Sequence, residues 1–341
     1  MDIPTLKQQL KTASTAQVYL VLGTQSELQN EARQAFLTLI PEEERVMNVA
    51  SFDLEETPLA TALADAKAAP FFGERRLVFL QKPSFLTGST SRGSLKQDPA
   101  LLQDYLAHPE LNTTLVLLAP YEKLDGRKAV TKALKKVAVE VSAAPLAERQ
   151  ARLAIEQRAQ VQGFHFESGA MDELVKRTNA DYGQMMNYLS SLLLYAHDEE
   201  VITKAAVAGL VPQSLDENVF DLVQAVLQRR QGQAMDLYQQ LIAAQQQPLQ
   251  INAVLVSQFR LLIQVKILAQ RGLSESTITK QLKVHPYRVK LALQTVRQYQ
   301  LAALFKAQMG LVTTEQQLKS TTRDPELLFQ MFLLQFSRQA Q

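Results

Sequence analysis

The chain contains no cysteine among its 341 residues, which excludes disulfide bonds, thiolate metal sites and cysteine nucleophiles and is typical of a reducing compartment. Its 36 basic and 34 acidic residues leave a net charge of +2, so no overall positive field attracts nucleic acid. The first residues form no basic-then-apolar signal segment, and no apolar run approaches the roughly 18 residues that span a membrane. We therefore expect a cytoplasmic protein with no membrane partner.

The chain also lacks a complete phosphate-binding loop where its first elements would place one. Residues 17–38 have the pattern of a strand, a tight turn and a helix, and the turn is Gly23-Thr24-Gln25-Ser26-Glu27. A phosphate loop needs glycines that let backbone N–H groups close on the phosphates, a lysine for their charge and a hydroxyl for magnesium. Only Gly23 remains of this set, and Glu27 would repel a phosphate. The pattern indicates the frame of an ATPase without its chemistry.

Other groups that an ATPase needs are missing as well. After the apolar run 77–80, where an acidic pair should hold magnesium, stands Gln81-Lys82-Pro83. The apolar run 115–118 ends in Ala119-Pro120, which offers no polar side chain to a γ-phosphate. The four histidines lack the spacing of metal ligands. We therefore predict no catalytic residue, no cofactor and no metal.

The first 141 residues alternate short apolar runs with helical patterns, as in a mostly parallel sheet covered on both faces. A polar loop is expected over residues 84–97, as a surface connection or, alternatively, as a binding loop. The predicted strands are 18–22, 77–80, 115–118 and 137–141, with a further candidate at Arg45–Val49, and the predicted helices are 26–38, 57–68, 98–107 and 126–135.

Beyond residue 143 the patterns are helical only, with breaks at 197–202 and 211–214. The fold class predicted is an α/β N-terminal domain followed by two all-α domains, with domains at residues 1–143, 144–211 and 212–341. A last helix is expected after Asp324-Pro325, an N-cap and a first-turn proline. This helix is apolar on nearly all sides, so it is buried either in its own bundle or against a partner.

One motif combines a proline with two adjacent large apolar residues, Pro70-Phe71-Phe72-Gly73, between a predicted helix and a predicted strand. The side chains of two residues that are adjacent in sequence do not easily pack into the same hydrophobic core. Either one phenylalanine fixes the helix end to the sheet and the other covers it, or the pair is an exposed contact for a partner.

Basic residues form two candidate DNA-binding faces, and each is alternatively an ordinary solvated surface. We expect at most weak, salt-sensitive DNA binding from the isolated chain. One face contains Lys123, Arg127, Lys128, Lys132, Lys135 and Lys136. The other contains Lys280, Lys283, Arg288, Lys290 and Arg297, together with Tyr287 and Tyr299.

Three stretches, in this order and spacing, resemble the delta subunit family of the bacterial DNA polymerase III clamp loader along essentially the whole chain. They are Tyr19-Leu20-Val21-Leu22-Gly23, residues 68–80 around Pro70-Phe71-Phe72-Gly73, and residues 218–227 together with His285-Pro286-Tyr287-Arg288-Val289-Lys290. The resemblance implies an AAA+-like sheet domain, a helical lid and a C-terminal collar in a ring-shaped hetero-oligomer.

The resemblance also implies a function and a set of partners. A member of this family opens the sliding clamp (the beta subunit) for loading onto primed DNA and does not hydrolyse ATP itself. Its partners are the tau/gamma and delta prime subunits, through the collar, and Pro70, Phe71 and Phe72 match the clamp-binding element. The alternatives are a working NTPase with an atypical loop, the other non-motor subunit of the loader, which typically carries zinc-ligating cysteines, and a generic helical adaptor.

Overall fold

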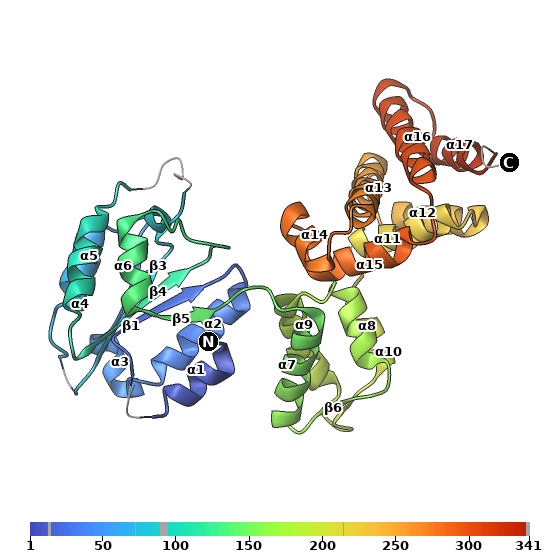
Figure 1. Cartoon of the computed structure of the whole chain (residues 1–341). Coiled ribbons are helices and arrows are strands. Elements are labelled where there is room, and N and C mark those ends of the chain that lie inside the picture. The colour runs from blue at the N-terminus through green and yellow to red at the C-terminus, as the bar shows by residue number, and fades with distance from the viewer. Residues whose placement is uncertain (13–14, 72, 89–94, 214, 339–341) are drawn as a thin grey trace. The chain divides into compact units, whose positions relative to one another are not determined.

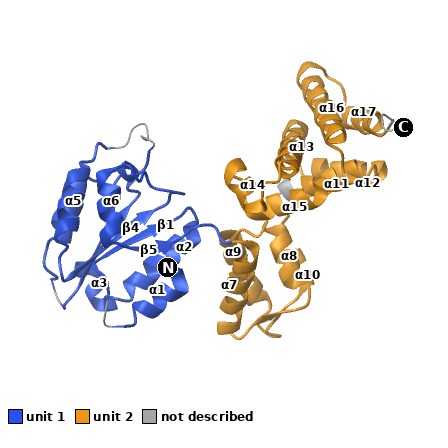
Figure 2. Ribbon diagram, viewed as in Figure 1, with its two compact units in different colours: residues 1–146 blue, residues 147–341 orange. Residues whose placement is uncertain are grey.

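The computed structural model describes residues 1–12, 15–71, 73–88, 95–213 and 215–338, without the side chains of residues 216, 217 and 338. It divides into two compact units, residues 1–146 and 147–341 (Figure 2). The first unit is α/β and the second is helical, which confirms the predicted fold class (Figure 1). The boundary predicted at residue 211 lies inside the second unit, so the division into three domains stays a prediction.

A five-stranded parallel sheet in the order β2-β3-β4-β1-β5 forms the centre of the first unit. The strands predicted at 18–22, 77–80, 115–118 and 137–141 are confirmed; the first has the predicted ends, and the ends of the other three differ. The strands are β1 (Val18–Leu22), β2 (Val49–Asp53), β3 (Arg76–Gln81), β4 (Thr113–Ala119) and β5 (Val139–Ser142).

Helices cover both faces of this sheet because its strands are apolar on both sides. Alternate residues of β1, β3 and β4, such as Leu20, pack against α4, α5 and α6, and the intervening ones, such as Tyr19 and Phe79, pack against Phe36 of α2. Burial on both faces is expected of a parallel sheet. The helices of the unit are α1 (Ile3–Gln9), α2 (Ser26–Leu37), α3 (Arg45–Asn48), α4 (Leu59–Ala66), α5 (Pro99–Ala107) and α6 (Ala129–Val137), with short 3-10 turns at Glu42–Glu44 and Ser84–Leu86.

The prediction of a strand at Arg45–Val49 is wrong, because Arg45–Asn48 is helix α3 and the edge strand β2 begins only at Val49. Pro41 and the acidic run Glu42–Glu44 precede α3, and a proline with carboxylates favours the start of a helix. The polar loop expected at 84–97 is described in part, since residues 89–94 lie outside the described residues.

The second unit begins with a group of helices that also contains a small parallel pair of strands, β6 (His165–Phe166) and β7 (Val201–Ile202). The sequence predicted a break at 197–202, where β7 lies. The pairing of two such short strands is set by tertiary contacts that the sequence pattern does not reveal. The helices here are α7 (Glu148–Val161), α8 (Ala170–Arg177), α9 (Tyr182–Tyr195) and α10 (Lys204–Leu210).

Seven further helices complete the second unit, and the buried side chains of α13 among them include Phe259 and Leu255. By length and composition α13 is the single helix among the described residues that could cross a membrane, with a mean hydropathy of 1.5, but 61% of that window is buried within the protein, as in a core helix. The seven helices are α11 (Leu215–Leu227), α12 (Gln231–Ala243), α13 (Pro248–Gln270), α14 (Glu275–Leu282), α15 (Pro286–Val296), α16 (Leu301–Ser320) and α17 (Pro325–Arg338).

The last helix, α17, is only partly covered. The predicted N-cap is confirmed, since the Glu326 N–H donates to the Asp324 carboxylate at 2.8 Å. Phe329 stacks on Tyr238 with ring centroids 4.3 Å apart and is buried, whereas Leu327 and Leu334 remain 49% and 42% exposed. Packing within its own helical bundle therefore buries most of the apolar side chains of α17, but Leu327 and Leu334 stay partly exposed.

Candidate functional site

In a nucleotide-binding sheet of this topology, the ligand-binding site lies between the carboxyl ends of β1 and β4. These strands are neighbours, and β1 continues into α2 on one face of the sheet while β4 continues into α6 on the other. Ligands of open α/β sheets bind in the crevice that such a divergence creates.

Backbone groups of the chain itself close the loop over this crevice. The Gly23 N–H donates to the Ala119 carbonyl at 3.2 Å, and the Gln25 N–H donates to the Ala143 carbonyl at 2.9 Å. Gly23 has φ +148°, and a Cβ there would overlap the backbone of Ala143 and Ala144. The chain leaving β5 thus lies against the glycine that, in a phosphate loop, lets the backbone approach a phosphate.

The side chain of Gln29 completes this closure. It is 8% exposed, and its Nε2 lies 2.9 Å from the Gly23 carbonyl, 3.2 Å from that of Ala119 and 3.3 Å from that of Val21. Counted from Gly23 along the pattern G-x-x-x-x-G-K-[ST], Gln29 stands at the lysine, Leu28 at the second glycine and Asn30 at the hydroxyl residue. The sequence analysis did not single out Gln29, although this register was the signal that could have found it.

A lysine stands where an ATPase places its magnesium-binding acids, directly after β3. The Lys82 ammonium lies 2.7 Å from the Asp53 carboxylate and 3.4 Å from that of Glu55. Its hydrogen bond to Asp53 lowers the pKa of that carboxyl and raises the pKa of Lys82. The carboxylates of Asp53, which ends the neighbouring strand β2, and of Glu55 therefore share one ammonium group. The described residues contain no cluster of three side chains that could hold a metal ion.

The predicted contact motif lies in the loop between α4 and β3. The Phe71 side chain is 65% exposed, and its backbone N–H donates to the side-chain oxygen of Asn48 at 2.8 Å. Asn48 is fully buried at the end of α3. Pro70 precedes Phe71 and is half-buried, while Phe72 lies outside the described residues. An apolar side chain is thus held towards solvent by a backbone hydrogen bond to a buried amide.

A buried arginine anchors the far end of the same loop. The Arg76 guanidinium donates to both carboxylate oxygens of Asp65, at 2.6 and 3.1 Å, and also to the backbone carbonyls of Asp65 at 3.0 Å and of Met47 at 3.2 Å. It joins the end of α4, helix α3 and the start of β3. Gly73, at φ +73°, lies against the Glu44 carboxylate, where a Cβ would not fit. Val46 and Met47, next to Asn48 in sequence, are exposed apolar residues as well.

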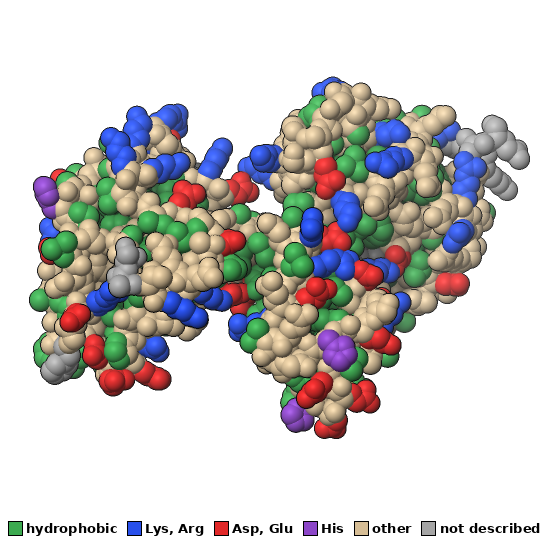
Figure 3. Space-filling model, turned by 60° about the horizontal axis from the view of Figure 1, so that its bottom comes forward, with side chains coloured by type: hydrophobic (Ala, Val, Ile, Leu, Met, Phe, Trp, Pro, Cys, Tyr) green, Lys and Arg blue, Asp and Glu red, His purple; other side chains and the backbone are tan. Residues whose placement is uncertain are grey.

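The basic residues named from the sequence are placed differently from one another. Lys280 and Lys283 are exposed, Arg288 lines a cavity and Lys290 bonds Glu148 at 2.5 Å. On the first unit, Lys128 donates to the carbonyls of Phe85 and Thr87 at 2.8 and 2.7 Å and Arg127 pairs with Asp125, whereas Lys123, Lys132, Lys135 and Lys136 are exposed. Acidic and basic side chains are interspersed on the visible face of the helical unit (Figure 3). DNA contact by either face stays a prediction.

The fold and the edge of its sheet together define the class of this protein: an α/β unit with a parallel five-stranded sheet and an incomplete phosphate loop, followed by a helical unit. A family model for the DNA polymerase III delta subunit matches residues 19–144, and one for the C-terminal domain of that subunit matches residues 216–336. The sequence is 34% identical to DNA polymerase III subunit delta of Bacillus subtilis (strain 168) over 327 residues, which are 96% of this chain and 94% of that protein.

The fold is likewise similar to a solved structure, the DNA clamp loader delta protein of Bacillus subtilis. The TM-score is 0.75 at 33% identity, with 99% of this chain and 100% of that chain covered. The chain belongs to the DNA polymerase III delta subunit family, and it is thereby a clamp-loader component of DNA replication.

The closure by Gln29 can be tested through stability. In Gln29→Leu the three carbonyls lose their buried donor, so we expect the free energy of unfolding to fall by about 1–3 kcal/mol. Gln29→Glu should lower the free energy of unfolding further than Gln29→Leu does. Its carboxylate oxygens would face the three carbonyl oxygens, and both kinds of oxygen can only accept hydrogen bonds. Urea denaturation followed by circular dichroism measures both.

The matched control is Gln34→Leu, at an exposed position of the same helix, which should change stability by no more than about 0.5 kcal/mol. Equal stability of Gln29→Leu and Gln34→Leu would show that the Gln29 amide does not hold the loop.

Proposed function

We propose that this chain binds the sliding clamp, the beta subunit, through Pro70, Phe71 and Phe72, and helps to open it for loading onto primed DNA. The observation that carries the proposal is the exposed Phe71 side chain on a loop anchored by Asn48 and Arg76. Full burial of a phenylalanine contributes about 1.5–3 kcal/mol, so an apolar pair can be the energetic centre of a small interface. An ordered loop also loses less conformational freedom on binding.

Opening follows from a difference in affinity. If the loop binds the open or strained clamp more tightly than the closed one, binding shifts the clamp towards opening by that difference in free energy. No covalent step is involved, and no nucleotide needs to be hydrolysed by this chain. In the proposal, sister subunits that bind ATP control when the loop meets the clamp.

The contacts at the carboxyl edge of the sheet support a subunit that does not hydrolyse ATP itself. Gln29, Ala143 and Lys82 occupy the positions that would otherwise bind phosphate and magnesium. A working NTPase with an atypical loop would need this edge to open and the Lys82 ammonium to leave its two carboxylates. The other non-motor subunit of the loader is disfavoured by the absence of cysteine.

Assembly is the second part of the proposal. We place the contacts with the tau/gamma and delta prime subunits on the C-terminal helices, where Phe305 and Met309 of α16 and Leu327 and Leu334 of α17 are exposed. Residues 1–143 would then be the clamp-binding domain, 144–211 the lid and 212–341 the collar. As a clamp-loader subunit the chain would work in the cytoplasm, with primed DNA bound by the whole complex.

The clamp contact is tested by the double variant Phe71→Ala with Phe72→Ala. Because both rings would leave the interface, we expect affinity for the same organism's clamp to fall at least about 100-fold. Calorimetry with the purified chain, in the absence of nucleotide, measures it. Leu101→Ala, at an exposed leucine of α5 in the same unit, should bind like the wild type. Unchanged binding by the double variant, with the fold intact by circular dichroism, would place the contact elsewhere.

The anchoring of the loop is tested by Asn48→Ala, which keeps Phe71 and Phe72. Without the hydrogen bond to the Phe71 N–H the loop must be ordered on binding, so we expect about three- to tenfold weaker clamp affinity. The matched control is Gln97→Ala, which removes an amide that donates to the Leu54 and Thr57 carbonyls at 2.7 and 2.9 Å and supports the start of α4. If both variants lose affinity equally, general destabilisation explains the loss and the anchor does not.

A further inference from the structure

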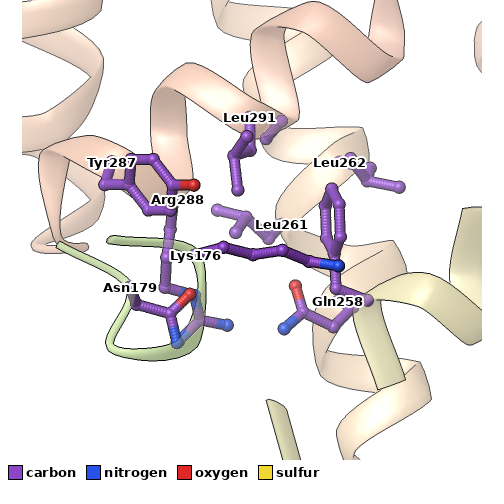
Figure 4. Close-up of a pocket in the computed structure, with 10 residues that line it drawn as sticks. Lys176, Asn179, Gln258, Leu261, Leu262, Tyr287, Arg288 and Leu291 are labelled. Carbon is purple, nitrogen blue, oxygen red and sulfur yellow. The ribbon is translucent and has the colours of Figure 1, made fainter. Parts of the chain in front are cut away.

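The helical unit contains a cavity of about 150 Å³ between the end of α8 and helices α11, α13 and α15 (Figure 4). Leu261 and Leu291 are among its walls, and Lys176, which also lines it, pairs with Asp221 at 3.3 Å. A charge that is already paired within the chain does not select a ligand. The surface of the α/β unit gives a stronger indication of a partner.

The large apolar side chains that the α/β unit leaves most exposed all lie at one edge of its sheet. Val46 and Met47 precede strand β2, Phe71 precedes β3 and Leu111 precedes β4. These three strands are neighbours and run parallel, so the four residues belong to the amino edge of the sheet. Among the described residues of this unit, they are the only large apolar side chains more than half exposed, with Val46 at 86%, Leu111 at 85%, Phe71 at 65% and Met47 at 51%.

Hydrogen bonds hold the three segments side by side. The Phe71 N–H donates to the Asn48 side chain at 2.8 Å, and the Arg76 guanidinium donates to the Met47 carbonyl at 3.2 Å. On the other side of β3, the Arg76 N–H donates to the Asn112 carbonyl at 2.8 Å. Neighbouring strands lie about 4.8 Å apart, so roughly 10 Å separates β2 from β4. The four exposed residues are therefore within reach of a single partner.

The clamp contact proposed above needs more surface than its two phenylalanines supply. One phenylalanine buries about 150–250 Å², so Phe71 and Phe72 together bury at most about 500 Å². A stable protein–protein interface buries about 800 Å² on each partner. Val46, Met47 and Leu111 are exposed apolar residues at the same edge that can supply the remainder.

The same three segments present more acidic than basic groups to solvent. Arg45 and Arg75 are half-buried, and Lys67 is the exposed lysine or arginine among the described residues of these segments. An apolar surface with acidic neighbours favours a partner whose own apolar surface is bordered by basic groups. The exposed acidic residues of segments 42–48, 67–75 and 108–112 are Glu42, Glu43, Glu74 and Glu110.

We propose that the clamp contact of this chain extends along the amino edge of the sheet, from Val46 and Met47 through Phe71 to Leu111. This inference rests on the clamp binding proposed above and adds the outer parts of that interface. The side chains on either side of Phe71 pack against apolar groups of the clamp, and basic groups of the clamp meet Glu43 and Glu74. Because one sheet carries all three segments, the clamp binds a surface that is already formed.

A probe at single positions tests the extension directly, since the chain has no cysteine of its own. Val46→Cys and Leu111→Cys, each labelled with a polarity-sensitive fluorophore, should gain emission with a blue shift when the same organism's clamp is added, because the probe leaves water. Leu101→Cys, at an exposed position of α5, should not respond. A clamp that binds without any response at residues 46 and 111 would overturn the proposal.

Calorimetry separates this proposal from the phenylalanine contact itself. Val46→Ser with Met47→Gln, and likewise Leu111→Ser, should weaken clamp binding at least about fivefold and shift the melting temperature by less than about 2 °C, since these side chains are exposed. If both variants bind like the wild type while Phe71→Ala with Phe72→Ala loses binding, the extension is wrong and the clamp contact stands. A wild-type chain that does not bind the clamp would overturn both.

Two further measurements test the chemistry and identity of the partner. Glu43→Gln with Glu74→Gln should weaken clamp binding at low salt at least about threefold and reduce its salt dependence, whereas the exposed Glu122→Gln should do neither. Unchanged salt dependence would overturn the basic border. Sedimentation should show the isolated chain as a monomer. A dimer that Leu111→Ser dissociates would assign the amino edge to a second copy and overturn the proposal.

Discussion

The Gln29 side chain donates hydrogen bonds to the carbonyls of Val21, Gly23 and Ala119 and so holds the loop after β1 against the strand ends of the α/β unit. In a nucleotide-binding sheet these strand ends and the loop after β1 are arranged around phosphates. Here a neutral amide at the position of the phosphate-binding lysine bonds them to one another, and the Ala143 carbonyl takes the Gln25 N–H. The sheet therefore keeps the strand–loop–helix frame of a nucleotide-binding protein, while groups of the chain itself bond the strand ends to one another. The Gln29 Oε1 atom remains buried without a hydrogen-bond partner.

The parallel sheet also separates the surface around Phe71 from the carboxyl edge that contains Gln29. All five strands run in one direction, so the crevice lies at their carboxyl ends and the loop before β3 lies at the opposite, amino edge. The Phe71 loop is held at that amino edge by hydrogen bonds of Asn48 and Arg76. The surface around Phe71 and the crevice beside Gln29 therefore lie at opposite edges of the same sheet.

Much of this fold could be predicted from the sequence, because buried parallel strands and amphipathic helices leave strong local patterns. The elements that were missed depend on distant partners. Helix α3, where the pattern predicted a strand, is held by a hydrogen bond from the distant Arg76 to its Met47 carbonyl. Strands β6 and β7 are too short to show a period. At the site, the sequence singled out Phe71 but not Asn48, because a hydrogen bond between residues 48 and 71 leaves no local signal. Gln29 does have a local signal, because it stands at the lysine position of the phosphate-loop pattern that begins at Gly23.

The central claim is that the chain closes its own nucleotide crevice, and the most direct test is ATP binding to the purified protein with magnesium present, by calorimetry or equilibrium dialysis. The account predicts no saturable binding in the millimolar range by the wild type. It predicts none by Gln29→Lys either, since restoring the lysine leaves Ala143 on the loop and Lys82 on the acids. Saturable ATP binding by the wild-type chain would contradict the account and would favour a working NTPase.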